Sequence, residues 1–274
     1  MPVIDFHIHI ARPEHYQPWV IEWMQSVAPP DLLENLRETV TPSGIQAMLA
    51  ANGVDYAVAL AEISPITTGV TDNEYVAEFC RDIPQLIPFA NINPFLTARP
   101  AEELARCVQE MGFRGLKMYP TYQYFYPNDP LLYPIYARAQ DLGIPVMFHT
   151  GSSVFRGARI KYGDPLCFDD VAVDFPELTI VMSHSGRGFW YDCAAFLARL
   201  HPNVYMEIAG LPPRKLLTYF PDLERLADKV LFGSDWPALP SLAGNIAAIR
   251  ELPLSDADKE KILGGNAARI LGLA

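Results

Sequence analysis

Short apolar segments recur along the chain and alternate with stretches of helical periodicity. After the first, they begin about every 25 to 35 residues, which leaves room for one helix and two loops between consecutive segments. Several are apolar throughout, as is typical of parallel strands buried on both faces. We predict eight parallel strands at Val3–Ile10, Asp55–Ile63, Leu86–Asn93, Phe113–Tyr119, Ile144–His149, Leu178–His184, Val204–Ile208 and Val230–Asp235.

The intervening stretches carry helix signals. Pro100–Met111 and Phe189–Leu200 have apolar residues on one face. Asp129-Pro130 predicts the start of a helix that ends at Gly143, and Ser255 predicts the cap of a C-terminal helix. The chain of 274 residues is close to the roughly 250 that such a fold needs. The pattern therefore predicts a (β/α)8 TIM barrel that forms one domain over residues 1–274.

Two segments interrupt this rhythm. Ala11–Pro42 contains Trp19, Trp23 and Pro29-Pro30 and is too long for a simple strand-to-helix loop. We expect it to fold over the barrel mouth as a lid or to pack against a second subunit. The tyrosine-rich segment Tyr119–Pro130 is predicted as a loop that stacks on a flat substrate, or that forms a packed cap or a subunit contact.

Charge and cysteine content narrow the class of protein. The net charge of −11 argues against binding to nucleic acid or to anionic membranes, which attract basic surfaces. No apolar stretch approaches the roughly 20 residues of a membrane-spanning helix. The four cysteines are widely spaced, and the first strand starts near residue 1 without a signal peptide before it. We therefore expect a cytoplasmic protein.

Polar side chains with metal-binding chemistry stand at the ends of the predicted strands. Strand alternation would place Asp5, His7 and His9 on one face, directed into the barrel. His149 and Asp235 end the fifth and eighth predicted strands, and the eighth lies beside the first in a closed barrel. His7, His9, His149 and Asp235 together offer three nitrogens and one oxygen, and a water would complete a catalytic metal site.

Each of these histidines alone is compatible with an ordinary buried, hydrogen-bonded role. Their joint position at strand ends favours a metal site instead. His184 ends the sixth predicted strand and would bind a second ion, orient the substrate or donate a proton. We assign no role to His15 or His201, which lie in a polar loop and a predicted turn.

The order of motifs resembles the amidohydrolase superfamily. The motifs are Asp5-x-His7-x-His9, Gly112-Phe113-Arg114-Gly115-Leu116-Lys117, His149-Thr150-Gly151, Ser183-His184-Ser185-Gly186, Gly233-Ser234-Asp235-Trp236-Pro237 and Gly265–Gly272. The resemblance covers Asp5 to Gly272. It is strongest with the amidohydrolase-related group that includes aminocarboxymuconate-semialdehyde and resorcylate-type decarboxylases.

This resemblance implies a distorted TIM barrel with a divalent metal, often zinc, held by His7, His9, His149 and Asp235. One ion is favoured over two, because this branch mostly uses one. The histidine that matches His184 is catalytic or close to the metal in the family. For hydrolysis, Asp235 would take a proton from the attacking water and His184 would stabilise the oxyanion or protonate the leaving group.

Four further charged residues have open roles. Lys117 would be carboxylated between two metals, form a salt bridge inside the barrel, or bind a substrate carboxylate, and we favour the last two. Asp5 would support a histidine or bond to backbone. Arg187 is the best candidate to bind an anionic substrate among the mouth cations, which also include Arg12, Arg156, Arg159 and Lys161. Glu207 is interpreted as structural.

These inferences lead to two enzymatic hypotheses. We predict a metal-dependent hydrolase of a small, carboxylated amide, ester or lactone. The alternative is a non-oxidative decarboxylase that holds a carboxylated aromatic or unsaturated acid at the same metal. A barrel that only binds a metal or ligand is disfavoured, because the set of ligands is complete. The barrel fold and the tryptophan-bearing insertion predict a homo-oligomer, a dimer in the simplest case.

Overall fold

A computed structural model describes residues 1–27, 31–237 and 241–273, and its main sheet has eight strands in chain order. The strands are β1 (Ile4–Ile8), β2 (Tyr56–Leu60), β5 (Leu86–Ala90), β6 (Gly115–Met118), β7 (Val146–Gly151), β8 (Ile180–Arg187), β9 (Val204–Glu207) and β10 (Val230–Leu231). Neighbouring strands pair in parallel. The predicted TIM barrel is confirmed.

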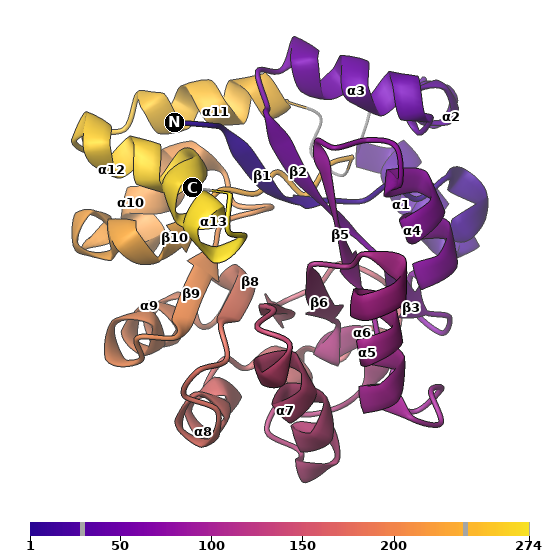
Figure 1. The fold of residues 1–274 in the computed structure, drawn as a ribbon. Helices are drawn as coiled ribbons and strands as arrows, with labels where there is room; N and C mark the ends of the chain where they lie inside the picture. Colours follow the sequence, from indigo (N-terminus) through magenta and orange to yellow (C-terminus); the bar gives the residue numbers. More distant parts are fainter. Residues whose placement is uncertain (28–30, 238–240, 274) are drawn as a thin grey trace.

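Helices surround the strands, as Figure 1 shows. They are α1 (Pro18–Val27), α2 (Leu32–Thr39), α3 (Pro42–Ala51), α4 (Asn73–Cys80), α5 (Pro100–Met111), α6 (Pro120–Gln123), α7 (Tyr133–Asp141), α8 (Cys167–Asp174), α9 (Tyr191–Leu200), α10 (Leu216–Tyr219), α11 (Leu242–Arg250), α12 (Asp256–Glu260) and α13 (Asn266–Ile270). The amphipathic stretches predicted at Pro100–Met111 and Phe189–Leu200 correspond to α5 and α9. No helix in the described ranges is long and apolar enough to cross a membrane.

The barrel is closed between the first strand and the segment that follows β10. The amide of Asp235 donates to the carbonyl of His7 at 3.0 Å, and the amide of His9 donates to the carbonyl of Trp236 at 2.8 Å. The regular part of β10 is only two residues long. The predicted strand Val230–Asp235 nevertheless continues to pair along β1 as an irregular extension.

The alternation predicted for β1 is broken by a bulge. Asp5 pairs with Ala57 and Ile8 with Ala59, so three steps on β1 match two on β2. As a result Phe6 does not pack outward with Ile8, as strict alternation would require. Instead its ring packs edge-on against Phe89, with ring centroids 5.5 Å apart. Both rings belong to a buried apolar cluster to which most strands of the barrel contribute residues.

Two connections differ from the predicted pattern. The predicted strand Asp55–Ile63 divides into β2 and the first strand of a separate antiparallel hairpin, β3 (Glu62–Ser64) and β4 (Gly69–Thr71). The predicted loop Tyr119–Pro130 contains the short helix α6. Within the insertion Ala11–Pro42 the chain forms α1 and α2, while residues 28–30, with Pro29-Pro30, lie outside the described residues.

Candidate functional site

A cavity of about 340 Å³ opens at the carboxyl ends of the strands, where the active sites of TIM barrels lie. Its polar floor contains side chains from β1, β7, β8 and the segment after β10. The floor residues are His7, His9, His149, His184, Arg187 and Asp235. Every predicted site residue except Lys117 therefore lines this one cavity.

Three of the predicted metal ligands converge closely. The Nε2 atoms of His7 and His9 lie 3.2 Å apart, and Asp235 Oδ1 lies 3.3 Å from the first and 3.5 Å from the second. Burial alone would raise the pKa of Asp235, but the surrounding histidines outweigh it and hold that pKa well below its usual range. The cluster thus presents an ionised carboxylate beside imidazole nitrogens, which is the donor set of a divalent transition metal.

His149 lies near this cluster but is not part of it. Its ring packs edge-on against His184, with centroids 4.7 Å apart, and against Tyr122 at 4.8 Å. Its Nε2 atom is buried and has no hydrogen-bond partner in the described part of the chain. Burial also lowers its pKa well below the usual value, so the ring is neutral. A buried imidazole nitrogen with a free lone pair fits a metal ligand, because a metal ion would satisfy it.

Glu207 lies behind His7 and outside the cavity lining, a supporting position compatible with the structural interpretation from the sequence. It ends β9, is fully buried, and its Oε2 lies 3.2 Å from Nδ1 of His7. This contact fixes the ring so that Nε2 faces His9 and Asp235. Burial raises the pKa of Glu207 to about 8. A carboxylate at the end of a barrel strand was the available signal, and it is the same signal that identified Asp235.

His184 and Asp235 share an unusual backbone conformation. Their φ angles are 61° and 62°, and Ser185 beside His184 has a φ of 47°. Residues other than glycine rarely adopt this left-handed region, and such strain concentrates at functional sites. Nδ1 of His184 lies 2.8 Å from the carbonyl oxygen of Ala209 and donates to it, which leaves Nε2 as its free nitrogen.

The two predicted substrate-binding cations occupy different environments. Arg187 lines the cavity, with Nη1 3.9 Å from Asp235 Oδ2 and Nη2 donating to the carbonyl of Ser152 at 3.1 Å. Lys117 is fully buried and lies outside the cavity lining, where its Nζ donates to Ser183 Oγ at 2.5 Å. Burial lowers the pKa of Lys117 to about 8. No carboxylate of the described chain lies within salt-bridge distance of it, so the predicted internal salt bridge is absent there.

Asp5 takes the second of its two predicted roles. Its Oδ1 accepts the backbone N–H of Ser234 at 2.8 Å and of His7 at 3.1 Å, and no hydrogen bond or ion pair to a histidine ring is found among the described residues. Burial raises its pKa to about 7. The carboxyl group therefore ties the two ligand-bearing segments together through their backbones.

The walls of the cavity are aromatic. Trp23 and Phe155 meet edge to face at 5.1 Å, and Tyr119 stacks on Tyr122 at 5.8 Å. The other four predicted mouth cations lie outside the lining, and each lies over an aromatic ring. Arg12 lies over Tyr75, Arg156 over Trp19, Arg159 over Tyr124 and Lys161 over Tyr162.

The cavity wall also contains an acidic residue that was not predicted. Glu62 of β3 lines the cavity and is only 7% exposed, and the Thr68 hydroxyl donates to its Oε1. No pattern in the sequence indicates this position, because the residues around Glu62 have the apolar pattern of the end of a continuous strand.

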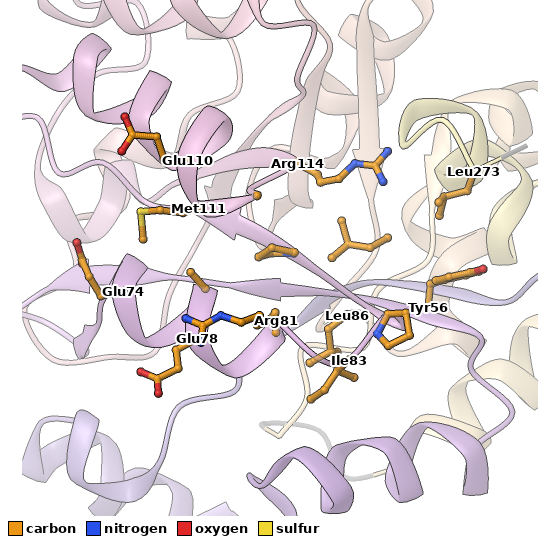
Figure 2. A pocket seen from close by; sticks show the side chains of 16 residues that line it. Tyr56, Glu74, Glu78, Arg81, Ile83, Leu86, Glu110, Met111, Arg114 and Leu273 are labelled. Carbon is orange, nitrogen blue, oxygen red and sulfur yellow. The ribbon is translucent and has the colours of Figure 1, made fainter.

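A second cavity, of about 740 Å³, lies at the opposite ends of the strands (Figure 2). It adjoins Tyr56 and Leu86, which begin β2 and β5, and Arg114, which precedes β6. Glu74, Glu78 and Arg81 at its edge are exposed to solvent. Although it is larger than the first cavity, it contains none of the predicted metal ligands. It is therefore not the candidate functional site.

A barrel with a histidine–aspartate cluster at its carboxyl end is typical of metal-dependent enzymes. Residues 4–273 match the family model described as amidohydrolase, and the chain belongs to this family. It is 26% identical over 238 residues to a 2-amino-3-carboxymuconate-6-semialdehyde decarboxylase of Dictyostelium discoideum, covering 73% of this chain. The match spans 65% of that relative, slightly less than two thirds of its length.

Other relatives match this chain over a larger share of both sequences. A gamma-resorcylate decarboxylase of Polaromonas sp. is 26% identical, with 84% of each chain matched. Among solved structures, an uncharacterised TIM-barrel protein from Bordetella bronchiseptica has a TM-score of 0.79 at 26% identity, with 99% of each chain covered. A 2,6-dihydroxybenzoate decarboxylase from Rhizobium has a TM-score of 0.74 at 21% identity, covering 100% of this chain and 99% of that one, and supports the fold.

The metal cluster gives the first prediction. Replacing His149 with Ala is expected to lower metal affinity by at least about 100-fold, because a ligand with no alternative partner is lost. Elemental analysis of the purified protein measures the metal content. His201→Ala is the matched control, since His201 bonds to Asp169 at 2.7 Å outside the cavity and its loss should leave the content unchanged. Full occupancy in His149→Ala would remove His149 from the ligand set.

Proposed function

We propose that this protein is a metal-dependent, non-oxidative decarboxylase of a small carboxylated aromatic or conjugated unsaturated acid. The proposal rests on the position of Arg187. Its guanidinium lies next to the metal-type cluster, formed by His7, His9 and Asp235, in a cavity with aromatic walls. A guanidinium binds a carboxylate in a fixed orientation. Flat aromatic walls favour a planar ligand.

The relatives support this function over the hydrolase that the sequence favoured. The two curated relatives described above are decarboxylases by name. A more distant relative, 23% identical over 98% of this chain, is named a 2-keto-4-carboxy-3-hexenedioate hydratase, from Sphingobium. Hydrolysis of a carboxylated ester, amide or lactone is therefore the weaker of the two hypotheses.

His7, His9, His149 and Asp235 would hold one divalent cation. Such an ion supplies positive charge that binds substrate oxygens and offsets the negative charge that builds up during the reaction. Zinc was expected from the sequence. A structural relative from Polaromonas, 22% identical, contains bound manganese. Both metals accept this donor set, so we propose a divalent ion with zinc and manganese as the candidates.

The remaining residues perform the binding and the proton transfer. Arg187 holds the carboxylate, and the aromatic walls exclude water. When the bond between the carboxyl carbon and the rest of the substrate breaks, carbon dioxide leaves and the electron pair stays on the substrate carbon. That carbon then needs one proton. We assign its delivery to Nε2 of His184, because Nδ1 already donates to the Ala209 carbonyl. Burial lowers the pKa of His184 well below its usual value, so the ring is neutral between turnovers. Nε2 therefore takes up a proton from solvent and passes a proton to the substrate carbon, which returns the ring to its neutral form.

The insertion Ala11–Pro42 serves as a roof in this proposal. Val20, Trp23 and Met24 of α1 all line the cavity. This position favours the lid over the subunit contact of the two alternatives. Dimer formation remains a prediction from the sequence. Substrate binding by Lys117 remains a prediction from the sequence. Its ammonium group lies outside the cavity lining and donates to Ser183.

A direct assay separates the candidate reactions. The metal-loaded protein is incubated with carboxylated aromatics, including 2,6-dihydroxybenzoate, and carbon dioxide is measured. Release that depends on the metal supports the proposal. Turnover of lactones or esters without carbon dioxide release would instead support the hydrolase, and loss of a conjugated double bond would support a hydratase.

His184→Asn tests the proton carrier. We expect kcat to fall by about 10²- to 10⁴-fold, the usual contribution of general acid–base catalysis, while the metal content stays unchanged. Steady-state kinetics and elemental analysis are the two measurements. A variant that loses its metal together with its activity would show that His184 is a ligand rather than a proton carrier.

Arg187→Ala tests carboxylate binding. The change should mainly raise KM, by about 10- to 100-fold, because a hydrogen-bonded ion pair to the substrate is lost. Arg199→Ala is the control, since Arg199 lies near Asp222 on the outer face of the barrel. An unchanged KM in Arg187→Ala would remove Arg187 from the substrate site.

A further inference from the structure

Glu62 is a buried acid that the proposed reaction does not use. It lines the cavity from β3 and is only 7% exposed. The single hydrogen bond found on its carboxyl oxygens within the described chain comes from Thr68. No salt bridge to it is found among the described residues, although a carboxylate has about four acceptor positions. It therefore has capacity to accept hydrogen bonds from a ligand.

The hairpin holds Glu62 rigidly at this wall. The next residue, Ile63, donates its N–H to Asn91 Oδ1 at 2.8 Å, and its carbonyl accepts from Asn93 Nδ2 at 2.9 Å and Gln123 Nε2 at 3.0 Å. The hairpin is thus fixed from β5 and α6. Side chains that are anchored in this way keep their geometry when a ligand binds.

The insertion fixes the hairpin from its other side. The N–H of Gln17 donates to the carbonyl of Thr68 at 2.9 Å, and the indole of Trp19 donates to the carbonyl of Thr67 at 2.6 Å. Gly69 permits this close approach: a Cβ on it would lie 2.0 Å from the carbonyl oxygen of His15, and its φ of 137° suits only glycine.

Glu62 and Arg187 stand on opposite sides of the barrel mouth. Glu62 directly follows β2, the second strand of the ring, whereas Arg187 ends β8, the sixth. Three strands lie between them in either direction around a closed ring of eight. The metal-type cluster lies toward the side of β1 and β10. A planar ligand between the aromatic walls would therefore have an arginine at one end and a glutamate at the other.

We propose that Glu62 is a specificity-determining residue that accepts a hydrogen bond from a hydroxyl or amino group on the substrate, at the end remote from the carboxylate held by Arg187. This inference rests on the proposed function for the orientation of the substrate. It narrows the substrate class to a planar monocarboxylic acid with a hydrogen-bond donor on its far side. A second carboxylate at that end would be repelled.

Burial supports this assignment. It raises the pKa of the Glu62 carboxyl above its usual value, since water cannot solvate the anion fully. A donor group on the substrate would replace part of that lost solvation. An acid without the donor would leave the buried oxygen unsatisfied, and such a mismatch is how enzymes reject close analogues.

Binding measurements test the proposal without requiring turnover. The metal-loaded wild-type protein is titrated calorimetrically with 3- and 4-hydroxybenzoate and with the corresponding methoxybenzoates, which have no donor. We expect at least one hydroxy acid to bind about 10- to 100-fold more tightly than its methyl ether. In Glu62→Leu this ratio should fall close to one. Glu14→Leu, which removes an exposed glutamate outside the cavity lining, should keep it.

Several outcomes would overturn the proposal: equal binding of the pairs by wild type, an unchanged ratio in Glu62→Leu, or no binding of either hydroxy acid. If Glu62→Leu does not fold, a crystal structure of the metal-loaded wild type with the tighter hydroxy acid decides. A phenol oxygen within about 3.2 Å of a Glu62 oxygen supports the proposal, and one that points elsewhere overturns it. A hydroxyl preference without decarboxylation of any acid would instead overturn the proposed function alone.

Discussion

Closure of the barrel between β1 and the segment after β10 is the constraint on which the site depends. The hydrogen bonds from Asp235 to His7 and from His9 to Trp236 join two parts of the chain more than 220 residues apart. The same contacts bring two imidazoles and a carboxylate to within 3.5 Å of one another. Asp5 strengthens this junction by accepting backbone N–H groups on both sides of it. The fold and the metal-type cluster therefore share one set of contacts.

Two residues of the site are also held in backbone conformations that isolated residues would avoid. His184 and Asp235 both have positive φ angles, and each lies at the end of a strand-like segment. Positive φ at residues with a Cβ costs roughly 1–3 kcal/mol unless surrounding structure compensates. Here the compensation comes from backbone pairing and from bonds such as that between His184 and the Ala209 carbonyl. This left-handed backbone conformation directs both side chains into the cavity.

Much of this arrangement could be predicted from the sequence, because parallel strands have clear apolar runs and their carboxyl ends meet. That reasoning found His7, His9, His149, His184, Arg187 and Asp235, which all line one cavity. It could not place Phe6 correctly, because the bulge in β1 depends on pairing with β2. It also missed Glu62, because nothing in the run Asp55–Ile63 shows that the chain leaves the sheet after Leu60. The role of Glu207 behind His7 depends on which residues face each other across the barrel, and this is a property of the closed fold.

The small hairpin that carries Glu62 contains no strand of the barrel and none of the proposed metal ligands. Its antiparallel pairing is internal, and side chains and backbone of neighbouring segments secure it at the mouth. Alterations in this short stretch can therefore accumulate during evolution without disturbing the histidine–aspartate cluster. Divergent members of such a family could acquire new ligand preferences through this hairpin while retaining the same chemistry below it.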